Sequence, residues 1–553
     1  MLRGLMMDYQ LTVPAMLQRA ETLYGHKEIV TRLPDKRLHR YTYSEMVRRT
    51  KQLALALRRL GVGMGDRVAT LCWNHYQHLE AYFAIPSIGA VLHTLNLRLP
   101  PDDLAYVINH AGDRVLLVDE ILLPLFERVR GQVAVERVIV VGARGPVPEG
   151  MLDYEQLLAA EDPGGFIYPE LDERQAAAMC YTSGTTGRPK GVLYSHRAIV
   201  LHSICSALPD AAALSEADVV MPVVPMFHVN AWGMPFTATL LGCKQVFPGP
   251  HLDPQSLAEL IQAERVTFTC GVPTLWLGLL QLLDKQPGAY DLSSLRAVAV
   301  GGQSAPLAMI KGFQERHGIH VYHGWGMTET TPIGLIVGQN RDLLALPLEQ
   351  QYYYRATAGR PLPFFEIRSR NDQGLVPWDG ETMGELEVRG PWVASAYYNL
   401  PEGADAFTED GWLRTGDIVT IDPYGWVQIQ DRAKDVVKSG GEWISSVRLE
   451  NAIMAHPAVA EAAVIPARHP KWIERPVAVV VLKEGQQATP EELAEFLVSQ
   501  FPKWWLPDAY IFVPEIPKTS TGKFMKLALR ERYENYLVES GLVAMSSGEP
   551  TQD

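Results

Sequence analysis

Short apolar runs alternate with longer helical patterns between Asp66 and Tyr322. The runs predict strands at Arg67 to Leu71, Arg114 to Val118, Arg137 to Val141, Val266 to Thr269, Ala297 to Val300 and His320 to Tyr322. Strands that alternate with helices form parallel sheets covered by helices. Ligands of such sheets bind where strands end in glycine-rich turns. Three segments have that form: Met179 to Lys190, Val298 to Ser304 and Val321 to Thr328.

The pattern changes in the last third of the chain. From Gly380 to Gln430, short alternating strands separated by turns predict a small β-rich subdomain. After Asp431 the pattern starts afresh, with helices expected at Leu449 to His456, Glu491 to Ser499 and Lys526 to Tyr536 and strands at Val477 to Leu482 and Ala509 to Val513. The predicted fold class is therefore α/β. A large N-terminal domain of parallel-type sheets covered by helices, with the β-rich subdomain, spans residues 1–430, and a mobile α+β C-terminal domain spans residues 431–553.

Composition narrows the class of function. The 553 residues carry 50 Lys and Arg against 63 Asp and Glu, and this net charge of −13 argues against nucleic-acid binding. The five cysteines form no C-x-x-C pair, which indicates free thiols in a reducing compartment. Neither a secretory signal nor an apolar run of membrane-spanning length is recognisable. A cytoplasmic enzyme acting on small molecules is expected.

The segment Tyr181 to Gly191 reads Tyr-Thr-Ser-Gly-Thr-Thr-Gly-Arg-Pro-Lys-Gly. Glycine lets the backbone come close to an anion, and hydroxyl and cationic side chains can surround phosphate oxygens. These side chains are Thr182, Ser183, Thr185, Thr186, Arg188 and Lys190. The spacing departs from that of the P-loop, so the pattern predicts a phosphate site of another kind.

This segment resembles the phosphate signature of the adenylate-forming superfamily, which includes acyl-CoA synthetases, luciferases and nonribosomal adenylation domains. Further motifs follow in the family's order: Met226 to Trp232, Gly301 to Ser304, Gly324 to Thr330, Thr415 to Asp417, Asp431 to Glu442 and Pro517 to Lys523. The resemblance extends over nearly the whole chain. It implies an ATP-dependent acid:CoA ligase with ATP, Mg²⁺ and coenzyme A as cofactors, and a homodimer formed through the N-terminal region.

The resemblance assigns nucleotide contacts to a defined set of residues. They are Thr182, Ser183, Gly184, Thr185, Thr186, Gly187, Lys190, Gly302, Gln303, Ser304, Gly324, Trp325, Gly326, Met327, Thr328, Asp417 and Arg432. Within this set, Trp325 offers a flat face for adenine, and the acceptor-only carboxylate of Asp417 suits a ribose diol. Glu329 and Thr185 are the implied magnesium ligands, since a carboxylate can hold an ion that bridges phosphates.

The implied catalytic residues are Lys523, Glu329, Thr185 and His228. The ammonium of Lys523 would offset charge that develops as the substrate carboxylate attacks the α-phosphate. Asp431 is the implied hinge about which the small domain turns between adenylation and thioester formation. The residues assigned to hinge and coenzyme A are Asp431, Lys434, Lys438, Gly440, Gly441, Glu442 and Trp443.

The acyl pocket and its gate are assigned to His228, Val229, Asn230, Trp232 and Gly233. These segments most resemble bacterial medium- and long-chain fatty acyl-CoA synthetases. A methylthioalkanoate or an aryl acid remains an alternative substrate, whereas an amino acid is disfavoured because no Asp lies between His228 and Pro235. Two other hypotheses for the function remain. The chain could be a non-catalytic nucleotide-binding relative, or a luciferase-like oxidase that shares the first half-reaction.

Overall fold

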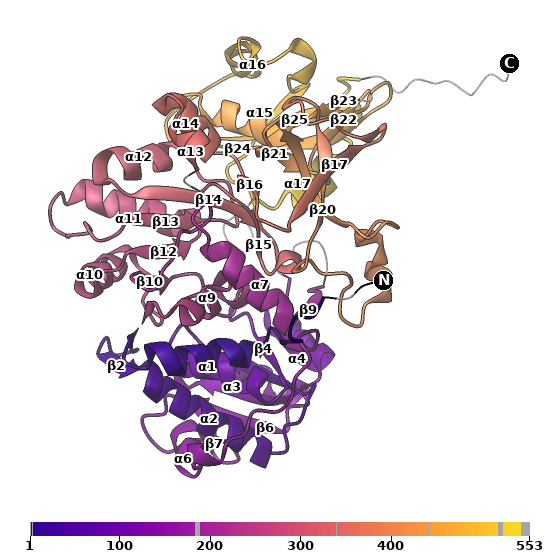
Figure 1. The fold of residues 1–553 in the computed structure, drawn as a ribbon. Helices are drawn as coiled ribbons and strands as arrows, with labels where there is room; N and C mark the ends of the chain where they lie inside the picture. The colour runs from indigo at the N-terminus through magenta and orange to yellow at the C-terminus, as the bar shows by residue number, and fades with distance from the viewer. Residues whose placement is uncertain are drawn as a thin grey trace. The chain divides into compact units, whose positions relative to one another are not determined.

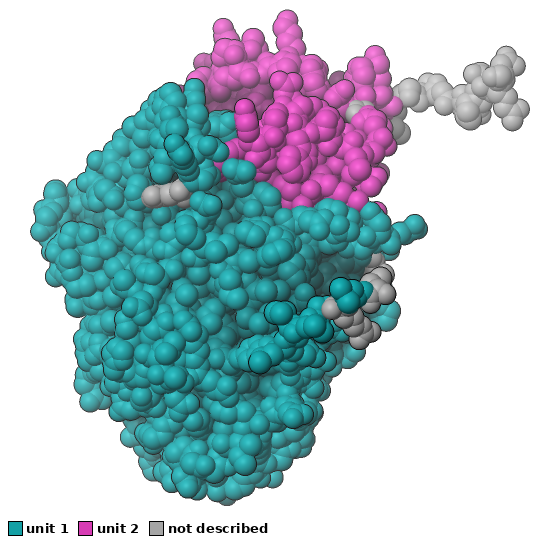
Figure 2. All heavy atoms as spheres, in the orientation of Figure 1, with its two compact units in different colours: residues 1–366, 388–413 teal, residues 367–387, 414–553 magenta. Residues whose placement is uncertain are grey.

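The structure is a computed structural model that describes residues 2, 4–182, 188–338, 340–440, 442–517 and 524–543, apart from the side chains of Glu402 and Ala404. The chain forms two compact units, coloured separately in Figure 2. Unit 1 comprises Met1–Glu366 and Val388–Leu413, and unit 2 comprises Ile367–Glu387 and Arg414–Asp553.

A sheet of seven strands lies in unit 1, counted over the residues that the structure describes. Its order is β7 (Leu152–Asp153), β6 (Arg137–Val141), β5 (Asp113–Asp119), β3 (Arg67–Leu71), β4 (Val91–Thr94), β8 (Ala176–Tyr181) and β9 (Gly191–Ser195). Neighbouring strands are parallel except for β8 and β9, which pair antiparallel with Tyr181 opposite Gly191. The phosphate segment therefore joins the ends of two paired strands.

A sheet of nine described strands completes the framework of unit 1. Its order is β16 (Arg360–Pro361), β15 (Ile333–Ile336), β14 (His320–Gly326), β13 (Ala297–Val300), β12 (Phe268–Gly271), β10 (Val219–Pro222), β11 (Lys244–Phe247), β1 (Glu28–Arg32) and β2 (Leu38–Thr42). The strand predicted from Val266 begins two residues later, because the Val266 N–H donates to Ile261 O, 3.1 Å away, at the end of the preceding helix.

Helices cover these sheets, as the alternating pattern predicts. They are α1 (Val13–Tyr24), α2 (Tyr43–Arg59), α3 (Tyr76–Ser87), α4 (Pro101–Ala111), α5 (Leu123–Glu127), α6 (Tyr154–Ala159), α7 (His196–Ala207), α8 (Val229–Trp232), α9 (Met234–Leu241), α10 (Pro254–Glu264), α11 (Pro273–Lys285), α12 (Leu307–His317), α13 (Arg341–Leu344) and α14 (Leu348–Arg355). In Figure 1, α10, α11 and α12 lie along β12 and β13. None of the helices in the described ranges has the length and apolar character that crossing a bilayer requires.

The central strands of unit 1, such as β4, β12 and β13, are buried on both faces. Val220 joins a core that includes residues from both sheets, whereas its neighbour Met221 joins a second core beneath α10, α11 and α12. Successive side chains of a strand point to opposite faces, so two cores require near-continuous apolar runs. This requirement explains why the strands were recognisable in the sequence.

Unit 2 contains residues 380–387 and 414–430 of the predicted β-rich subdomain, whereas residues 388–413 belong to unit 1. All of the C-terminal elements belong to unit 2. One sheet has the order β18 (Gly374–Leu375), β17 (Glu366–Asn371), β19 (Gly384–Arg389), β20 (Leu413–Ile421) and β21 (Val427–Arg432). The second has β23 (Glu442–Ile444), β22 (Val437–Ser439), β25 (Ile473–Leu482) and β24 (Val459–His469), with β26 (Ala509–Phe512) also paired to β25. Its helices are α15 (Ser446–Met454), α16 (Pro490–Val498), α17 (Lys526–Tyr533) and α18 (Tyr536–Glu539).

The division between the units lies upstream of the boundary predicted at Asp431. The chain beyond Asp431 contacts the strand that precedes it: Ser445 Oγ donates to Gln430 O, and Ser446 N–H donates to Asp431 Oδ2, 2.5 Å away. These contacts join the five-stranded sheet of β17 to β21 to the C-terminal elements as one compact unit.

Candidate active site

The phosphate segment is closed at its base by two hydrogen bonds. Thr182 N–H donates to Lys190 O over 2.9 Å, and Lys190 N–H donates to Thr182 Oγ1 over 3.0 Å. These bonds continue the pairing of β8 with β9. The other predicted members of the segment, Ser183, Gly184, Thr185, Thr186 and Gly187, lie outside the described residues.

A tyrosine joins the predicted magnesium carboxylate to a cation of the phosphate segment. The Tyr397 hydroxyl donates to Glu329 Oε1 over 2.6 Å, and the ammonium of Lys190 lies 4.7 Å from the centroid of the Tyr397 ring. Glu329 is 6% exposed. Burial, reinforced by the nearby carboxylate of Glu329, raises the pKa of the Tyr397 phenol, so this side chain remains a hydrogen-bond donor.

The backbone around Glu329 is fixed by its neighbours. The Tyr194 hydroxyl donates to Thr328 O over 2.7 Å, and Ala394 N–H donates to Glu329 O over 2.7 Å. Among the residues that the structure describes, no donor bonds to Glu329 Oε2. A carboxylate with one oxygen already oriented and the other available fits Mg²⁺, which is commonly bound through one or two carboxylates together with phosphates.

The turn after β13 packs closely against an aromatic ring. A Cβ atom at Gly301 would lie 3.0 Å from the ring of Trp232 and 3.1 Å from Gly324 O, so a larger residue would displace one of them. Gly302 has φ +76°, a conformation that glycine adopts without strain. The predicted nucleotide residues Gln303 and Ser304 follow in the same turn.

Trp325 lies in β14 and is 7% exposed, with its ring 6.4 Å from that of Phe365. Gly326 ends this strand, and a Cβ there would lie 2.1 Å from Pro332 O. The next predicted nucleotide residues, Met327 and Thr328, continue into the short turn that contains Glu329. The prediction that Trp325 stacks on adenine stays a prediction.

The predicted acyl segment has an unusual backbone. Five successive residues have positive φ: Val229 (45°), Asn230 (50°), Ala231 (51°), Trp232 (56°) and Gly233 (71°). Left-handed geometry costs a residue with a Cβ about 1–2 kcal/mol. The turn holds Trp232 at 8% exposure, and Asn230 Oδ1 accepts from the Cys180 thiol over 3.4 Å. His228, just before the turn, is half-buried, and the pocket that these residues are expected to line stays a prediction.

In unit 2, the structure brings together the two residues predicted to hold ribose. Asp417 of β20 lies opposite Arg432 of β21, and Arg432 Nε is 3.0 Å from Asp417 Oδ1. The Asp417 side chain is 5% exposed and that of Arg432 is 54% exposed. The guanidinium therefore keeps a buried carboxylate paired at the end of an antiparallel ladder.

The predicted hinge residue Asp431 belongs to a buried polar cluster that also includes Ser446, Glu450 and Lys526. Lys526 Nζ donates to Ser446 Oγ over 2.7 Å and pairs with Glu450 Oε1 over 2.5 Å. Burial raises the pKa of Asp431, and it raises the pKa of Glu450 to about 7. Sequence reasoning missed Glu450 and Lys526, because each is a single charged residue within an ordinary helical pattern.

The glycine pair after Asp431 forms a tight hairpin of β22 and β23. Lys438 lies opposite Trp443 and Ser439 opposite Glu442, and the Lys438 ammonium is 5.4 Å from the Trp443 ring. Gly440 has φ +61° and donates its N–H to Trp472 O over 2.9 Å. Burial lowers the pKa of the predicted hinge residue Lys434. Gly441 and the predicted catalytic Lys523 lie outside the described residues.

A cluster away from these motifs contains Cys72, His75 and Asp119, whose potential metal-ligand atoms lie within 4.8 Å of one another. His75 Nδ1 accepts the N–H of His78 as the cap of α3, and Nε2 lies 2.7 Å from Asp119 Oδ1. A nitrogen that accepts leaves the proton on the other, so Nε2 donates to the carboxylate. We interpret this cluster as a hydrogen-bonded structural group.

Comparison with known proteins places this arrangement in a family. The family model described as AMP-binding enzyme matches residues 17–398, and the model of the AMP-binding enzyme C-terminal domain matches residues 448–523. The chain belongs to the AMP-binding enzyme family. The predicted adenylate-forming superfamily is thereby confirmed.

Members of the AMP-binding enzyme family from bacteria are similar over nearly their whole length. A long-chain-fatty-acid CoA ligase of Thermus thermophilus is 52% identical over 96% of this chain and 97% of the relative. A medium-chain-fatty-acid CoA ligase of Ectopseudomonas oleovorans is 42% identical over 97% and 98%. A 3-methylmercaptopropionyl-CoA ligase of Ruegeria lacuscaerulensis is 43% identical over 97% and 99%.

Solved structures of the family share the fold. ATP-bound MatB of Rhodopseudomonas palustris has a TM-score of 0.80 and 26% identity, covering 95% of this chain and 100% of that one. An anthranilate CoA ligase in complex with anthranoyl-AMP has a TM-score of 0.79 and 26% identity, covering 95% and 98%. These similarities confirm the predicted α/β class with parallel sheets and a C-terminal α+β region.

Proposed function

We propose that the chain is an AMP-forming fatty acid:CoA ligase that uses ATP, Mg²⁺ and coenzyme A. The acid and ATP would give an acyl adenylate and pyrophosphate, and coenzyme A would then displace AMP to give acyl-CoA. The predicted ligase activity is supported by full-length similarity to fatty-acid CoA ligases at 52% and 42% identity. Five buried free cysteines fit a reducing, cytoplasmic location.

The main structural support for the proposal is that Tyr397 contacts both Glu329 and Lys190, a cation of the phosphate segment. Glu329 would hold Mg²⁺, with Thr185, and the ion would neutralise charge on the nucleotide phosphates. Lys190 and the closed base at Thr182 would orient the phosphates. The substrate carboxylate is already ionised at neutral pH and needs no general base, so Lys523 would act by offsetting charge at the α-phosphate.

Unit 2 would supply the ribose contact through Asp417 and Arg432, since a paired buried carboxylate is a fixed acceptor. We retain Asp431 as the pivot between the two half-reactions and residues 431–553 as the part that turns. The hairpin of Lys438 to Trp443 would then serve coenzyme A in the second step. Trapping each half-reaction with a matching adenylate analogue and measuring hydrogen exchange at residues 429–446 tests this pivot.

The substrate assignment is tested by pyrophosphate release with straight-chain acids from acetate to palmitate, with benzoate and with 3-methylthiopropionate, each with and without coenzyme A. A maximum at medium or long chains with acyl-CoA as product supports the fatty-acid proposal. The 43% identical 3-methylmercaptopropionyl-CoA ligase favours a methylthioalkanoate as the second candidate, and the anthranilate CoA ligase keeps an aryl acid as the third. Release with none of these acids would favour a non-catalytic relative.

The magnesium assignment is tested by Glu329→Gln. This change keeps the shape of the side chain and removes the charge, so we expect pyrophosphate release to fall at least about a hundredfold. Glu349→Gln is the control, because Glu349 is a surface residue paired with Lys311. Equal activity of the two variants would contradict the assignment.

We also propose a homodimer formed through the N-terminal region. The side chains of Leu2, Leu5, Met6, Met7 and Tyr9 are between 69% and 101% exposed. A run of exposed large apolar residues is typical of an interaction surface, and a second copy of the chain is the proposed partner. Light scattering of the full chain and of a variant lacking residues 2–9 tests this: a monomer in the full chain contradicts the proposal.

A further inference from the structure

Two opposite charges of the candidate site approach the same tyrosine from different directions. The carboxylate of Glu329 accepts the hydroxyl of Tyr397, whereas the ammonium of Lys190 lies over the face of the ring. Among the residues that the structure describes, no carboxylate lies within ion-pair distance of Lys190 Nζ. The Tyr397 side chain thus contacts both charged groups.

Hydrogen bonds join the segment before Tyr397 to the turn that contains Glu329. Ala394 N–H donates to Glu329 O, and Thr331 Oγ1 donates to Trp392 O over 2.8 Å. The Trp392 indole N–H donates in turn to Ile333 O over 3.0 Å. The segment that precedes Tyr397 is therefore tied through Trp392 and Ala394 to the turn that carries Glu329.

The second cation of the phosphate segment is arranged in the same way. The guanidinium of Arg188 lies 4.9 Å from the centroid of the Tyr106 ring in α4. An aromatic face attracts a cation without neutralising its charge, whereas a carboxylate partner would neutralise it. Both cations thus keep their charge available for an incoming anion.

We propose that Tyr397 is a positioning residue that prevents Lys190 from forming an ion pair with Glu329. Its hydroxyl orients one carboxylate oxygen, and its ring holds the ammonium apart from that carboxylate. The carboxylate then remains available to a divalent cation and the ammonium to the nucleotide phosphates. This inference rests on the proposed function, because it assigns Glu329 to the metal and Lys190 to the phosphates.

The test compares Tyr397→Leu, which removes both ring and hydroxyl, with Tyr397→Phe, which keeps the ring. Metal affinity is measured by electron paramagnetic resonance with Mn²⁺, on full-length protein saturated with a non-hydrolysable ATP analogue. If the ion pair occupies about nine tenths of the Tyr397→Leu molecules, Mn²⁺ binds about tenfold more weakly than to the wild type. Tyr397→Phe should lose only about two- to threefold, because its ring still separates the charges.

A second measurement reports on Lys190 directly. An ammonium in an ion pair has a raised pKa and reacts more slowly with an amine-acylating reagent. We therefore expect acylation of Lys190, measured by mass spectrometry relative to exposed Lys36, to slow in Tyr397→Leu but not in Tyr397→Phe. Tyr398→Phe, which removes the hydroxyl of the adjacent residue, is the control and should leave both readouts unchanged.

The decisive variant is the double change Tyr397→Leu with Lys190→Met. Removal of the competing cation should restore Mn²⁺ affinity at saturating analogue towards the wild-type value. Wild-type affinity in Tyr397→Leu, failure of Lys190→Met to restore it, or equal losses in the Leu and Phe variants would each overturn the inference. Failure of wild-type protein to release pyrophosphate with any acid would instead refute the proposed function. The Mn²⁺ and acylation measurements would still test whether Tyr397 keeps Lys190 from pairing with Glu329.

Discussion

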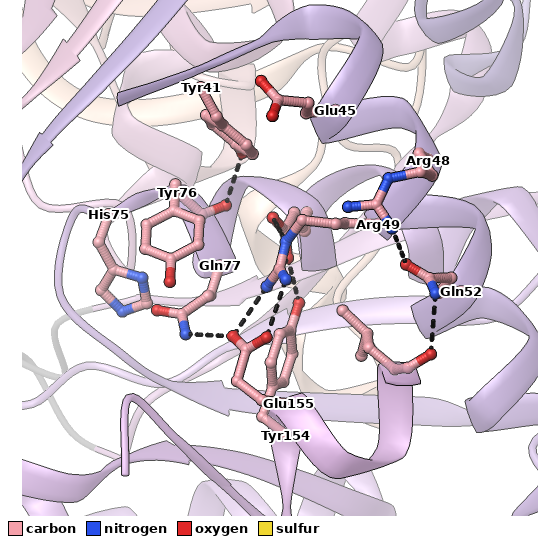
Figure 3. A network of polar contacts seen from close by, with 12 residues as sticks. Tyr41, Glu45, Arg48, Arg49, Gln52, His75, Tyr76, Gln77, Tyr154 and Glu155 are labelled. Atoms are coloured by element: carbon pink, nitrogen blue, oxygen red, sulfur yellow. Dashed lines mark hydrogen bonds and ion pairs between the residues drawn. The ribbon is translucent and has the colours of Figure 1, made fainter. Parts of the chain in front are cut away.

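Each unit contains a cluster of one cation and two carboxylates, and the two clusters use different cations. In unit 1, Arg49 of α2 bonds to Glu80 Oε1 over 2.7 Å and to both oxygens of Glu155 over 2.8 Å (Figure 3). The Tyr154 hydroxyl adds a donor to Glu80, and Gln77 adds one to Glu155. In unit 2, Lys526 serves as the cation for Glu450 and Asp431, and it is the one cation found beside them in the described part of the unit.

The difference lies in how many donors reach the carboxylates. Arginine presents a planar fork that bonds two carboxylates at once, whereas lysine is a compact point charge. Hydrogen bonds and charge from Arg49 outweigh burial and lower the pKa of Glu155, although burial raises that of Glu80. In unit 2, burial raises the pKa of both carboxyl groups, and that of Glu450 reaches about 7. The first cluster therefore links three helices, α2, α3 and α6, through hydrogen bonds between charged groups. In the second cluster, Glu450 can bind a proton near neutral pH.

Removal of either cation should destabilise its unit more than any other substitution in the two clusters. Arg49→Met leaves the fully buried Glu80 and the half-exposed Glu155 without a cation. Lys526→Met leaves the buried Glu450 and Asp431 without one. Removing the partner of a buried charge costs about 3–5 kcal/mol of unfolding free energy. We expect the greater loss at pH 7 for Arg49→Met, because Glu450 can neutralise itself by protonation. Hydrogen exchange of α2 and α15 amides measures each unit locally, and Lys311→Met on the exposed pair with Glu349 is the control. A loss as small as that of the control would contradict the prediction.

The pH dependence of Glu450 is the next largest effect. Its pKa rises from 4.5 to about 7 on folding, so folded protein loses stability as pH increases through this range. Asp431 and Lys526 face the same group. In Glu450→Gln this dependence is absent, and the unfolding free energy of the variant relative to wild type should rise by about 3 kcal/mol from pH 4.5 to 7 and level off above. Protection of the Val464 amide, which donates to Glu450 Oε1, measures it. A constant difference across this range would rule out the raised pKa.

Exchanging the two cations tests whether charge or donor geometry makes the clusters differ. Arg49→Lys keeps the charge and loses the fork, so we expect a loss of about 2 kcal/mol. Lys526→Arg would add donors for Glu450 and lower its pKa, which nuclear magnetic resonance titration of the labelled carboxyl group can follow. If Arg49→Lys is as stable as wild type, charge rather than geometry holds the first cluster together.

The smallest effects belong to the neutral donors. Tyr154→Phe removes one hydrogen bond to a fully buried carboxylate and should cost about 1–2 kcal/mol. Gln77→Ala removes a bond to Glu155, whose side chain is 49% exposed, and should cost about 0.5 kcal/mol by the same unfolding measurement. The reverse order would show that burial does not set the strength of these bonds.

Several strands could be predicted to the residue. β3, β6 and β13 begin and end as the apolar runs indicate, because a strand buried on both faces must be apolar throughout. β14 continues four residues beyond its predicted end into Gly326, since Trp325 and Gly326 pair with β15, a partner that the local sequence does not reveal. The predicted helix from Lys526 to Tyr536 is two helices, α17 and α18, with a break at Glu534 and Asn535.

The family, the order of the motifs and the candidate residues within each motif could be predicted from the sequence, because the residues of one motif are neighbours along the chain. Tertiary structure alone decided which of them share a partner. Tyr397 lies 68 residues from Glu329 and far from Lys190 in sequence, and Lys526 reaches Glu450 from another helix. Such contacts depend on how buried faces pack and on which charges must find partners away from water, and no local pattern of residues records that choice.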